Sequence, residues 1–394
     1  MHKSLTAYFG YFSHGIKKKL GELYTAFAIV DLATAMVLLF EPVYFVSVLG
    51  WSISSVFFFF AQVYFFYIIF VPFGGKFASS KGYERSLIWS IPFQIGYWLL
   101  LFSLPKFPEF AVVAAIFFAL QKTFFWPAFN AYLAKFSDKD QRARESSFAW
   151  SISQVSFIVG PFLGGIISDN FGVGTLLVIA SAIYFCMFIP LFAVPRSTDR
   201  TSYRFRDTVE LYKKYPREAV AYAGFGEELY VLVGWPIFIF LAVPDFFNFG
   251  TLIAVATLIS TVIMLYGGKL MDKSKKEEDI FLKYGVVISS LVWLIASFAR
   301  GLIGVFSIDT LLRIGRILFF TPVVAHMYNR AADEKTMAYS VFFEQTLSIG
   351  KVIAALLGTV IFLFTENFVF IFILAALFTL LYFVLERRKH LFTS

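Results

Sequence analysis

The sequence has 394 residues, of which 59% are hydrophobic, only 15% are charged and 53 are phenylalanine. A soluble core does not need that much apolar surface, so the composition predicts an all-α integral membrane protein. The net charge of +8 lies mainly in short loops, where it would orient the chain and meet anionic lipid headgroups rather than nucleic acid. A single cysteine, Cys186, excludes a disulfide within the chain.

Twelve apolar segments are long enough to cross a bilayer, which takes about 20 helical residues. They follow an aromatic-containing segment, residues 1–20, that we expect to lie at the membrane interface as a short helix. The predicted spans are 21–48, 53–73, 86–104, 109–134, 146–168, 173–194, 220–243, 248–266, 281–299, 306–328, 338–362 and 367–385.

All but six of the 34 Lys and Arg residues fall in alternate gaps between these segments. Positive charge is retained on the cytoplasmic side of a membrane. We therefore expect a multi-pass protein of the cell membrane, plasma or inner, with both termini in the cytoplasm. The longest polar stretch, residues 196–218, contains seven Arg and Lys and is predicted to be a basic cytoplasmic linker.

The parts on either side of this linker, residues 1–195 and 219–394, share short motifs at an offset of 193 to 195 residues. The matched pairs are Gly74-Gly75-Lys76 with Gly267-Gly268-Lys269, Pro42 with Pro236, Trp126-Pro127 with Thr321-Pro322, and Gly165 with Gly358. Four pairs in order, each in the equivalent span, predict a duplicated six-helix unit. One large class of secondary transporters has two such halves, with the substrate site between them near the midplane.

Two local motifs carry further information. The loop after the second span reads Gly75-Lys76-Phe77-Ala78-Ser79-Ser80-Lys81-Gly82-Tyr83-Glu84-Arg85, and its counterpart in the second half reads Gly268-Lys269-Leu270-Met271-Asp272-Lys273. The fifth span contains Gly160-Pro161-Phe162-Leu163-Gly164-Gly165. Proline removes a backbone donor and glycine lets helices approach closely, so the fifth-span motif predicts a bend and a packing surface.

In these motifs the chain resembles the major facilitator superfamily (MFS), and the likeness extends over nearly the whole sequence. The resemblance implies two pseudo-symmetric six-helix bundles, with spans one, four, seven and ten lining a central cavity. In that family the acidic position of the loop motif is implied in a cytoplasmic gating contact. This chain has Ser79 there but keeps Asp272 in the second half, which puts the contact in doubt for the first half only. The fifth-span motif is enriched in drug–proton antiporters but also occurs outside them.

The gating and structural candidates from these motifs are Gly75, Gly82, Arg85, Gly160, Pro161, Gly164, Gly165, Gly268 and Asp272.

Ionisable residues inside a bilayer are costly, so each is a functional candidate by default. The candidates for binding substrate or protons are Asp31 in span one, Lys122 and Trp126 in span four, Glu227 and Glu228 in span seven, and Arg313 and Arg316 in span ten. The secondary candidates are Glu344, Lys351, Gln154 and Asn130. With four acids and four bases counted inside the spans, we expect the interior to be formally neutral, which suits internal pairing or a relay.

Their positions suggest different roles. Arg313 and Arg316 share a helix face, and a guanidinium pair suits a carboxylate or phosphate, although Arg313 could instead anchor at the interface. Of the adjacent glutamates, at most one faces the cavity squarely, and Glu227 is favoured. We expect Lys122 and Arg316 to reach the cavity, and at least one of them to pair with Asp31, Glu227 or Glu228. The structural alternative is that the charges form salt bridges that lock helices together.

These features predict a secondary active transporter that moves a small organic solute by alternating access and is coupled to protons, with drug–proton antiport as one form. The buried cations favour an anionic or zwitterionic solute, whereas Asp31 and the span-seven glutamates favour protons or a cationic drug. A transport-inactive sensor or lipid-handling protein is the alternative, favoured by Ser79. Four scattered histidines and the absence of a nucleotide-binding motif point away from an enzyme, and we expect no cofactor or metal. The expected partners are the substrate, protons and lipids, and the protein is expected to be a monomer.

Overall fold

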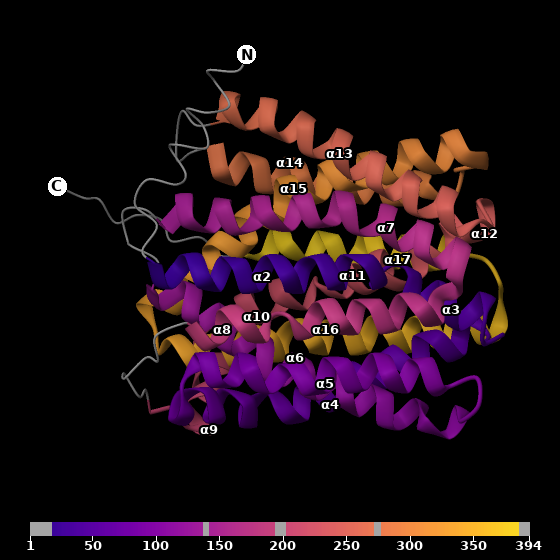
Figure 1. Cartoon of the computed structure of the whole chain (residues 1–394). Coiled ribbons are helices and arrows are strands. Elements are labelled where there is room, and N and C mark those ends of the chain that lie inside the picture. The colour runs from indigo at the N-terminus through magenta and orange to yellow at the C-terminus, as the bar shows by residue number, and fades with distance from the viewer. Residues whose placement is uncertain (1–17, 137–141, 194–201, 272–276, 386–394) are drawn as a thin grey trace, which may run out of the picture.

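The computed structural model describes residues 18–136, 142–193, 202–271 and 277–385, which form helices joined by short turns (Figure 1). The first six predicted spans give α2 (Lys18–Val37), α3 (Phe40–Ser47), α4 (Ile53–Lys81), α5 (Tyr83–Ser103), η1 (Pro108–Phe110), α6 (Ala111–Phe136), α7 (Arg142–Phe185) and α8 (Phe188–Ala193). The remainder gives α9 (Phe205–Lys214), α10 (Pro216–Ala223), α11 (Gly226–Leu229), η2 (Tyr230–Gly234), α12 (Trp235–Ala242), α13 (Phe246–Met271), α14 (Glu277–Ala296), α15 (Gly301–Asp333), α16 (Thr336–Phe364), α17 (Val369–Leu380) and η3 (Leu381–Val384). These ranges contain no strand, and the predicted all-α class is confirmed.

Each predicted span has a helical counterpart in the described ranges. Eight helices are long and apolar enough to cross a membrane, and one of them, Ser153–Phe192, covers the fifth and sixth spans together. The boundary predicted there is a change of direction inside α7, at Gly172, whose φ of 80° suits glycine. The ninth and twelfth spans are the shorter apolar helices Ile280–Ala296 and Val369–Val384, and the tenth is α15, which carries several charges.

The two most extensive contacts between the first six spans and the last six are those of α7 with α13 and of α4 with α16. The repeated glycines Gly165 and Gly358 lie at these two contacts. A methyl group added at Gly165 would come within 2.8 Å of the Phe246 carbonyl oxygen, and one at Gly358 within 2.6 Å of the Phe57 ring. Gly250 is also a neighbour of Gly165, and its number exceeds that of Phe57 by 250 − 57 = 193, the same offset that relates the two glycines. The internal repeat therefore appears in space as two equivalent contacts.

The glycines of the fifth-span motif pack against two different helices, α2 and α13. Added methyl groups at Gly160 and Gly164, which share a helix face, would lie 2.6 Å from Ala35 Cβ and 2.4 Å from the Met36 carbonyl oxygen. Gly165 points instead to α13. The motif is thus a packing surface on both sides of α7, which is the role that its composition predicts.

Spans one and seven are both interrupted. Span one breaks between α2 and α3, and Pro42 lies in the first turn of α3. Span seven breaks after Ala223, resumes as the single turn α11, and continues through the π-helical turn η2 into α12, which begins with Trp235-Pro236. Discontinuous helices and π-turns are frequent at functional sites, because they leave backbone groups and side chains in positions that a regular helix does not allow.

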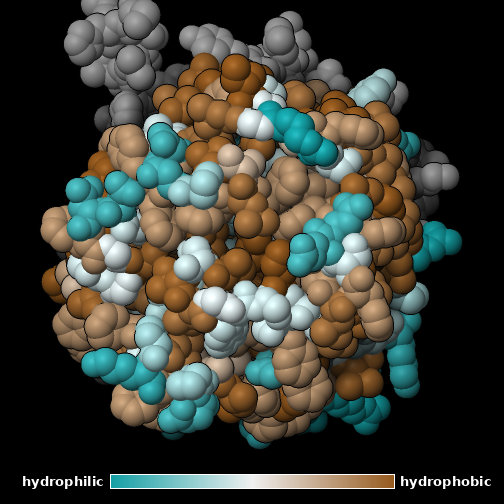
Figure 2. All heavy atoms as spheres, turned by 90° about the vertical axis from the view of Figure 1, so that its right-hand side faces the viewer, coloured by the Kyte–Doolittle hydropathy of each residue, from teal (hydrophilic) through white to brown (hydrophobic). Residues whose placement is uncertain are grey.

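The basic linker contributes α9 to one end of the bundle, and α3 and α12 lie at the opposite end (Figure 1). We call these the α9 end and the α12 end. At the α9 end, Lys335 Nζ donates to Asp207 at 2.7 Å, and Lys214 Nζ donates to Glu334 at 2.6 Å. Partial burial favours the neutral acid of Asp207, but the Lys335 ammonium and the Arg204 backbone N–H offset it and hold the Asp207 pKa below its usual range. Figure 2 shows the α12 end, which is largely apolar with small hydrophilic groups scattered over it.

We predict that Gly250→Ala will lower the thermal stability of the purified protein by several degrees. The added methyl group would lie 2.3 Å from the Pro161 carbonyl oxygen and would push α7 and α13 apart. The measurement is the midpoint of thermal unfolding in detergent. Gly304→Ala is the matched control, because its methyl group would lie 3.6 Å from its neighbours, which is ordinary contact. An equal shift in both variants would contradict the tight α7–α13 contact.

Candidate functional site

Three helices of the second half bring a cluster of charges together. Glu228 Oε2 of α11 lies 2.6 Å from Lys351 Nζ of α16, and Glu228 Oε1 lies 3.1 Å from Arg316 Nη2 of α15. Arg316 Nε also lies 3.9 Å from Glu227 Oε2. The break in span seven allows this arrangement, since α11 packs against α16 where Gly226 and Gly350 permit close backbone approach. One carboxylate thus bridges two cations from different helices.

The two adjacent glutamates have different surroundings. The Glu228 side chain is 21% exposed and forms both short ion pairs, whereas that of Glu227 is 2% exposed. Trp293 Nε1 donates to Glu227 at 3.3 Å, from α14. The single turn of α11 directs Glu228 between Arg316 and Lys351, so Glu228 forms the short ion pairs, whereas Glu227 meets only Arg316, at 3.9 Å. Arg316 pairs with Glu228 as expected.

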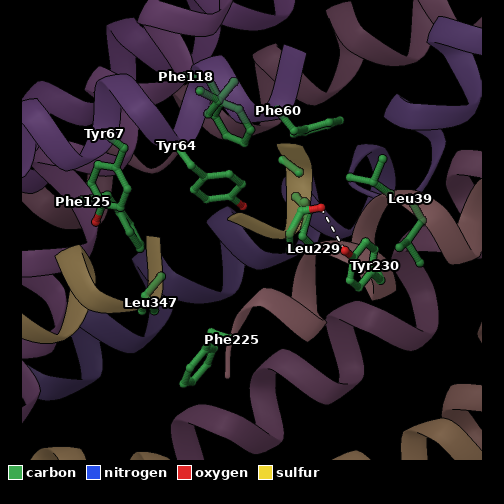
Figure 3. Packing of buried hydrophobic residues seen from close by; sticks show 14 of the residues in the cluster. Leu39, Phe60, Tyr64, Tyr67, Phe118, Phe125, Phe225, Leu229, Tyr230 and Leu347 are labelled. Atoms are coloured by element: carbon green, nitrogen blue, oxygen red, sulfur yellow. Dashed lines mark hydrogen bonds between the residues drawn. The ribbon is translucent and has the colours of Figure 1, made fainter. Parts of the chain in front are cut away.

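Lys122 lies on the first-half side of this cluster. Its Nζ is 4.2 Å from the centre of the Phe118 ring and 5.5 Å from that of Tyr64, and Lys351 Nζ is 5.1 Å from the same Tyr64 ring. Lysines from both halves therefore meet at one tyrosine. No Asp or Glu in the described ranges lies within 4.0 Å of Lys122 Nζ, so aromatic rings are its main neighbours. Figure 3 shows Tyr64 between Phe118 and Leu229, with its hydroxyl directed toward Leu229.

The secondary candidates divide into separate groups. Glu344 of α16 accepts hydrogen bonds from Tyr67 Oη at 2.9 Å and from Asn130 Nδ2 at 2.7 Å. Tyr328 Oη donates to Asn130 Oδ1 at 3.3 Å. Glu344 and Asn130 thus belong together, whereas Lys351 belongs to the Glu228 cluster. Gln154 Oε1 accepts only a long hydrogen bond of 3.5 Å from Thr261.

Arg313 is engaged within its own helix. Its Nε lies 2.7 Å from Asp309 Oδ2, and Asp309 Oδ1 accepts a 2.8 Å hydrogen bond from Trp235 Nε1. Arg313 thus pairs with Asp309 and not with the two span-seven glutamates. Asp309 was overlooked, although it lies inside the predicted tenth span. The count of four acids and four bases is therefore wrong.

The remaining carboxyl groups inside the spans have uncharged partners. Asp31 of α2 accepts a hydrogen bond from Ser153 Oγ of α7, and no cation of the described chain lies within 4.0 Å of it. Glu41 is buried and accepts a hydrogen bond from Tyr97 Oη. Asp31 is thus placed within the first half, apart from the charge cluster.

The other residues named from the sequence lie in packed helices, in a turn or outside the described residues. Trp126 packs on Phe125 and Phe129. Gly82 has a φ of 105° and forms the turn between α4 and α5, and Arg85 after it is exposed. Gly268 lies in α13, and Asp272 lies outside the described residues.

Sequence reasoning missed the aromatic residues that surround these charges, namely Tyr64, Tyr67 and Trp293. It also missed Glu218, which lies 2.9 Å from Arg330 Nε and 3.2 Å from His326 Nε2 near the α9 end. In a chain with 53 phenylalanines, an aromatic residue gives little signal. The polar atom of a tyrosine or tryptophan in an apolar span was the available clue, because such an atom needs a partner in lipid.

Comparisons with known proteins agree with this architecture. The family model described as Major Facilitator Superfamily matches residues 23–343. Among solved structures, the chain is similar to the human organic anion transporter MFSD10 (TETRAN), with a TM-score of 0.70 and 11% sequence identity over 94% of this chain and 99% of that one. At that identity the similarity shows the fold. No curated protein matches the chain.

The family match covers 343 − 22 = 321 of the 394 residues. The structural similarity to MFSD10 over 94% of the chain agrees with it. The chain therefore belongs to the Major Facilitator Superfamily and is a multi-pass membrane transporter.

Proposed function

We propose that this transporter moves a small organic anion by alternating access, coupled to the movement of protons. Lys122 is the main observation behind this proposal. It lies on a membrane-spanning helix, beside the charge cluster of the opposite half, with no carboxylate of the described chain within 4.0 Å. An unpaired charge in such surroundings is costly. A negative group on the cargo would supply the missing partner.

The balance of charge in the cluster agrees with an anionic cargo. Three cations, Lys122, Arg316 and Lys351, accompany two carboxylates, Glu227 and Glu228, which leaves 3 − 2 = 1 positive charge. A cargo with one negative charge would neutralise this excess. The rings of Phe118 and Tyr64 beside Lys122 would suit the carbon skeleton, since binding sites combine apolar walls with a few polar groups.

A cationic cargo fits the cluster less well. Glu228 already contacts two cations, and Glu227 is buried beside Arg316 and Trp293, so a positively charged drug would have to compete with cations already in place. The similar human structure is named as an organic anion transporter, which agrees with this choice without deciding it.

Asp31 is well suited to carry the coupling proton. The Ser153 hydroxyl can donate to a carboxylate or accept from a carboxylic acid, so their hydrogen bond tolerates both protonation states. A buried carboxyl group that meets water in only one conformation links its protonation to the transport cycle. Glu227 is the second carrier to test.

We also propose the arrangement in the membrane that the charge pattern predicts. The cell membrane would hold two halves, residues 1–195 and 219–394, with both termini and the linker 196–218 in the cytoplasm. The α9 end would then be the cytoplasmic end. The protein would work as a monomer among lipids, without catalysis or a cofactor.

A transport-inactive sensor or lipid-handling protein is the second candidate. Ser79 replaces an acidic residue of the loop motif, and its buried hydroxyl has no hydrogen-bond partner in the described part of the chain. Counterflow of a labelled organic anion in proteoliposomes separates the two functions. A screen of anions, zwitterions and cations under an imposed pH gradient then tests cargo and coupling together.

We predict that Lys122→Gln will raise the KM for an organic anion roughly 10- to 100-fold, with a smaller effect on the maximal rate. A hydrogen bond to a charged group contributes about 1.5–3 kcal/mol, and about 1.4 kcal/mol corresponds to a factor of ten. The measurement is initial uptake into proteoliposomes. Lys106→Gln, which removes an exposed lysine at the α12 end, is the matched control. An unchanged KM in the Lys122 variant would refute an anion contact there.

We predict that replacing the coupling carboxyl group, tested as Asp31→Asn and Glu227→Gln, will abolish uptake driven by a pH gradient and preserve gradient-free counterflow. The amides keep the shape of the side chain and cannot exchange a proton, so only the coupled process should be lost. If both variants retain gradient-driven uptake, the proton role assigned to these residues is wrong.

A further inference from the structure

Within the described parts of the chain, both donors to the Glu344 carboxylate belong to the opposite half of the molecule. Glu344 lies on α16, whereas its donors Tyr67 and Asn130 lie on α4 and α6. Glu344 is buried, and both of its carboxylate oxygens have a partner. We propose that Glu344 is the latch that closes the path from the charge cluster to the α9 end.

The residue after Glu344 strengthens the same contact. Gln345 Nε2 donates to the carbonyl oxygen of Ile68 in α4 at 3.1 Å. That oxygen would normally accept from the backbone N–H of residue 72, which is Pro72 and has none. Proline thus exposes a backbone acceptor on α4, and a side chain of the second half uses it. Two consecutive residues of α16 therefore hold the first half by hydrogen bonds.

The network also reaches the tenth span. Asn130, which donates to Glu344, accepts from Tyr328 of α15 at 3.3 Å. The amide of Asn130 is therefore fixed between two helices of the second half, and Glu344 joins four helices in all: α4, α6, α15 and α16. Opening the halves at this level would break the hydrogen bonds of Glu344 and Gln345 together.

The position of Glu344 along α16 indicates which path the network would close. Glu344 precedes Lys351 by seven residues, or about 10 Å of helix. On the side of the α9 end, an added methyl group at Gly75 would lie 2.5 Å from Val341 Cγ2, so α4 and α16 are in close contact there. The Glu344 network thus lies between the charge cluster and the α9 end. A cargo that leaves in that direction must pass it.

The chemistry of the network suits a contact that opens repeatedly. Lys351, Lys122 and Glu228 act on Glu344 only at longer range, and its direct partners are a phenol and an amide. Neutral donors can be exchanged for water when the halves separate, without leaving an isolated counter-charge behind. Near the end of α4, Ser79 offers no replacement contact, because its hydroxyl lacks a hydrogen-bond partner among the described residues.

Cysteine labelling tests the latch without any cargo, so its outcome is independent of the proposed anion transport. The only native cysteine is removed by Cys186→Ser, and the reporter Val341→Cys is added at the contact with Gly75. Glu344→Ala in this background should raise the rate of maleimide labelling at least tenfold. Glu344→Gln keeps an acceptor oxygen and should give a smaller rise, of about threefold.

Two controls separate a latch from a general loss of packing. Glu41→Ala removes another buried acid, whose partner Tyr97 lies in the same half, and should leave the labelling rate of Val341→Cys unchanged. The reporter Phe57→Cys lies at the other α4–α16 contact, near Gly358, and its labelling should not rise with Glu344→Ala. If Glu344→Ala does not fold, the double variant Tyr67→Phe with Asn130→Ala removes the two donors and should raise labelling of Val341→Cys in the same way.

Three results would overturn the latch. They are a labelling rate at Val341→Cys that stays within twofold of the parent, an equal rise in the Glu41→Ala control, and an equal rise at the Phe57→Cys reporter.

Discussion

A charge inside a membrane has to find a partner on a neighbouring helix, and this requirement organises the centre of the transporter. Glu228 satisfies it for two cations at once, by joining Lys351 of α16 to Arg316 of α15. The interruption of span seven is what directs Glu228 between them. Were α11 and η2 regular continuations of α10, Glu228 would not reach α15 and α16 in the same way, and Lys351 and Arg316 would have to be neutralised by other means.

Close backbone contacts determine how the two halves meet. Gly165 and Gly250 bring α7 against α13, and Gly358 brings α16 against Phe57 of α4. These contacts are related by the internal repeat, so the duplication of the sequence is also a duplication of the interface. Near the α9 end the α4–α16 contact differs in kind, because Glu344 and Gln345 add hydrogen bonds to packing. Hydrogen bonds can be replaced by bonds to water when two surfaces separate, whereas packed glycines simply let the helices approach closely. Such a combination is suited to two rigid halves that rock against one another.

The arrangement around Tyr64 connects this architecture to transport. Lys122 belongs to the first half and Lys351 to the second, and both lie against the same ring. A cargo bound there would touch both halves, so its binding energy would depend on how the halves are arranged. The two lysines are neutralised unequally, because Lys351 has Glu228 and the ring contacts of Lys122 among the described residues are with Phe118 and Tyr64; this difference is the basis of the proposed anionic cargo.

The sequence by itself determined the fold class, the helices and the internal repeat, because these follow from local hydrophobicity and from motifs that recur at a constant offset. It also identified Glu228, Arg316, Lys122 and Lys351 as important, since a charge in an apolar span is visible without a structure. Only the tertiary structure decided which charges pair. Glu227 and Glu228 are adjacent and chemically identical, and the π-turn and the break after Ala223 determine which one forms the short ion pairs with Arg316 and Lys351. Likewise, the sequence did not show that Arg313 pairs with Asp309, four residues earlier on the same helix. Pairing depends on helix rotation and on contacts between residues such as Glu344 and Tyr67, 277 positions apart, and local sequence patterns contain neither.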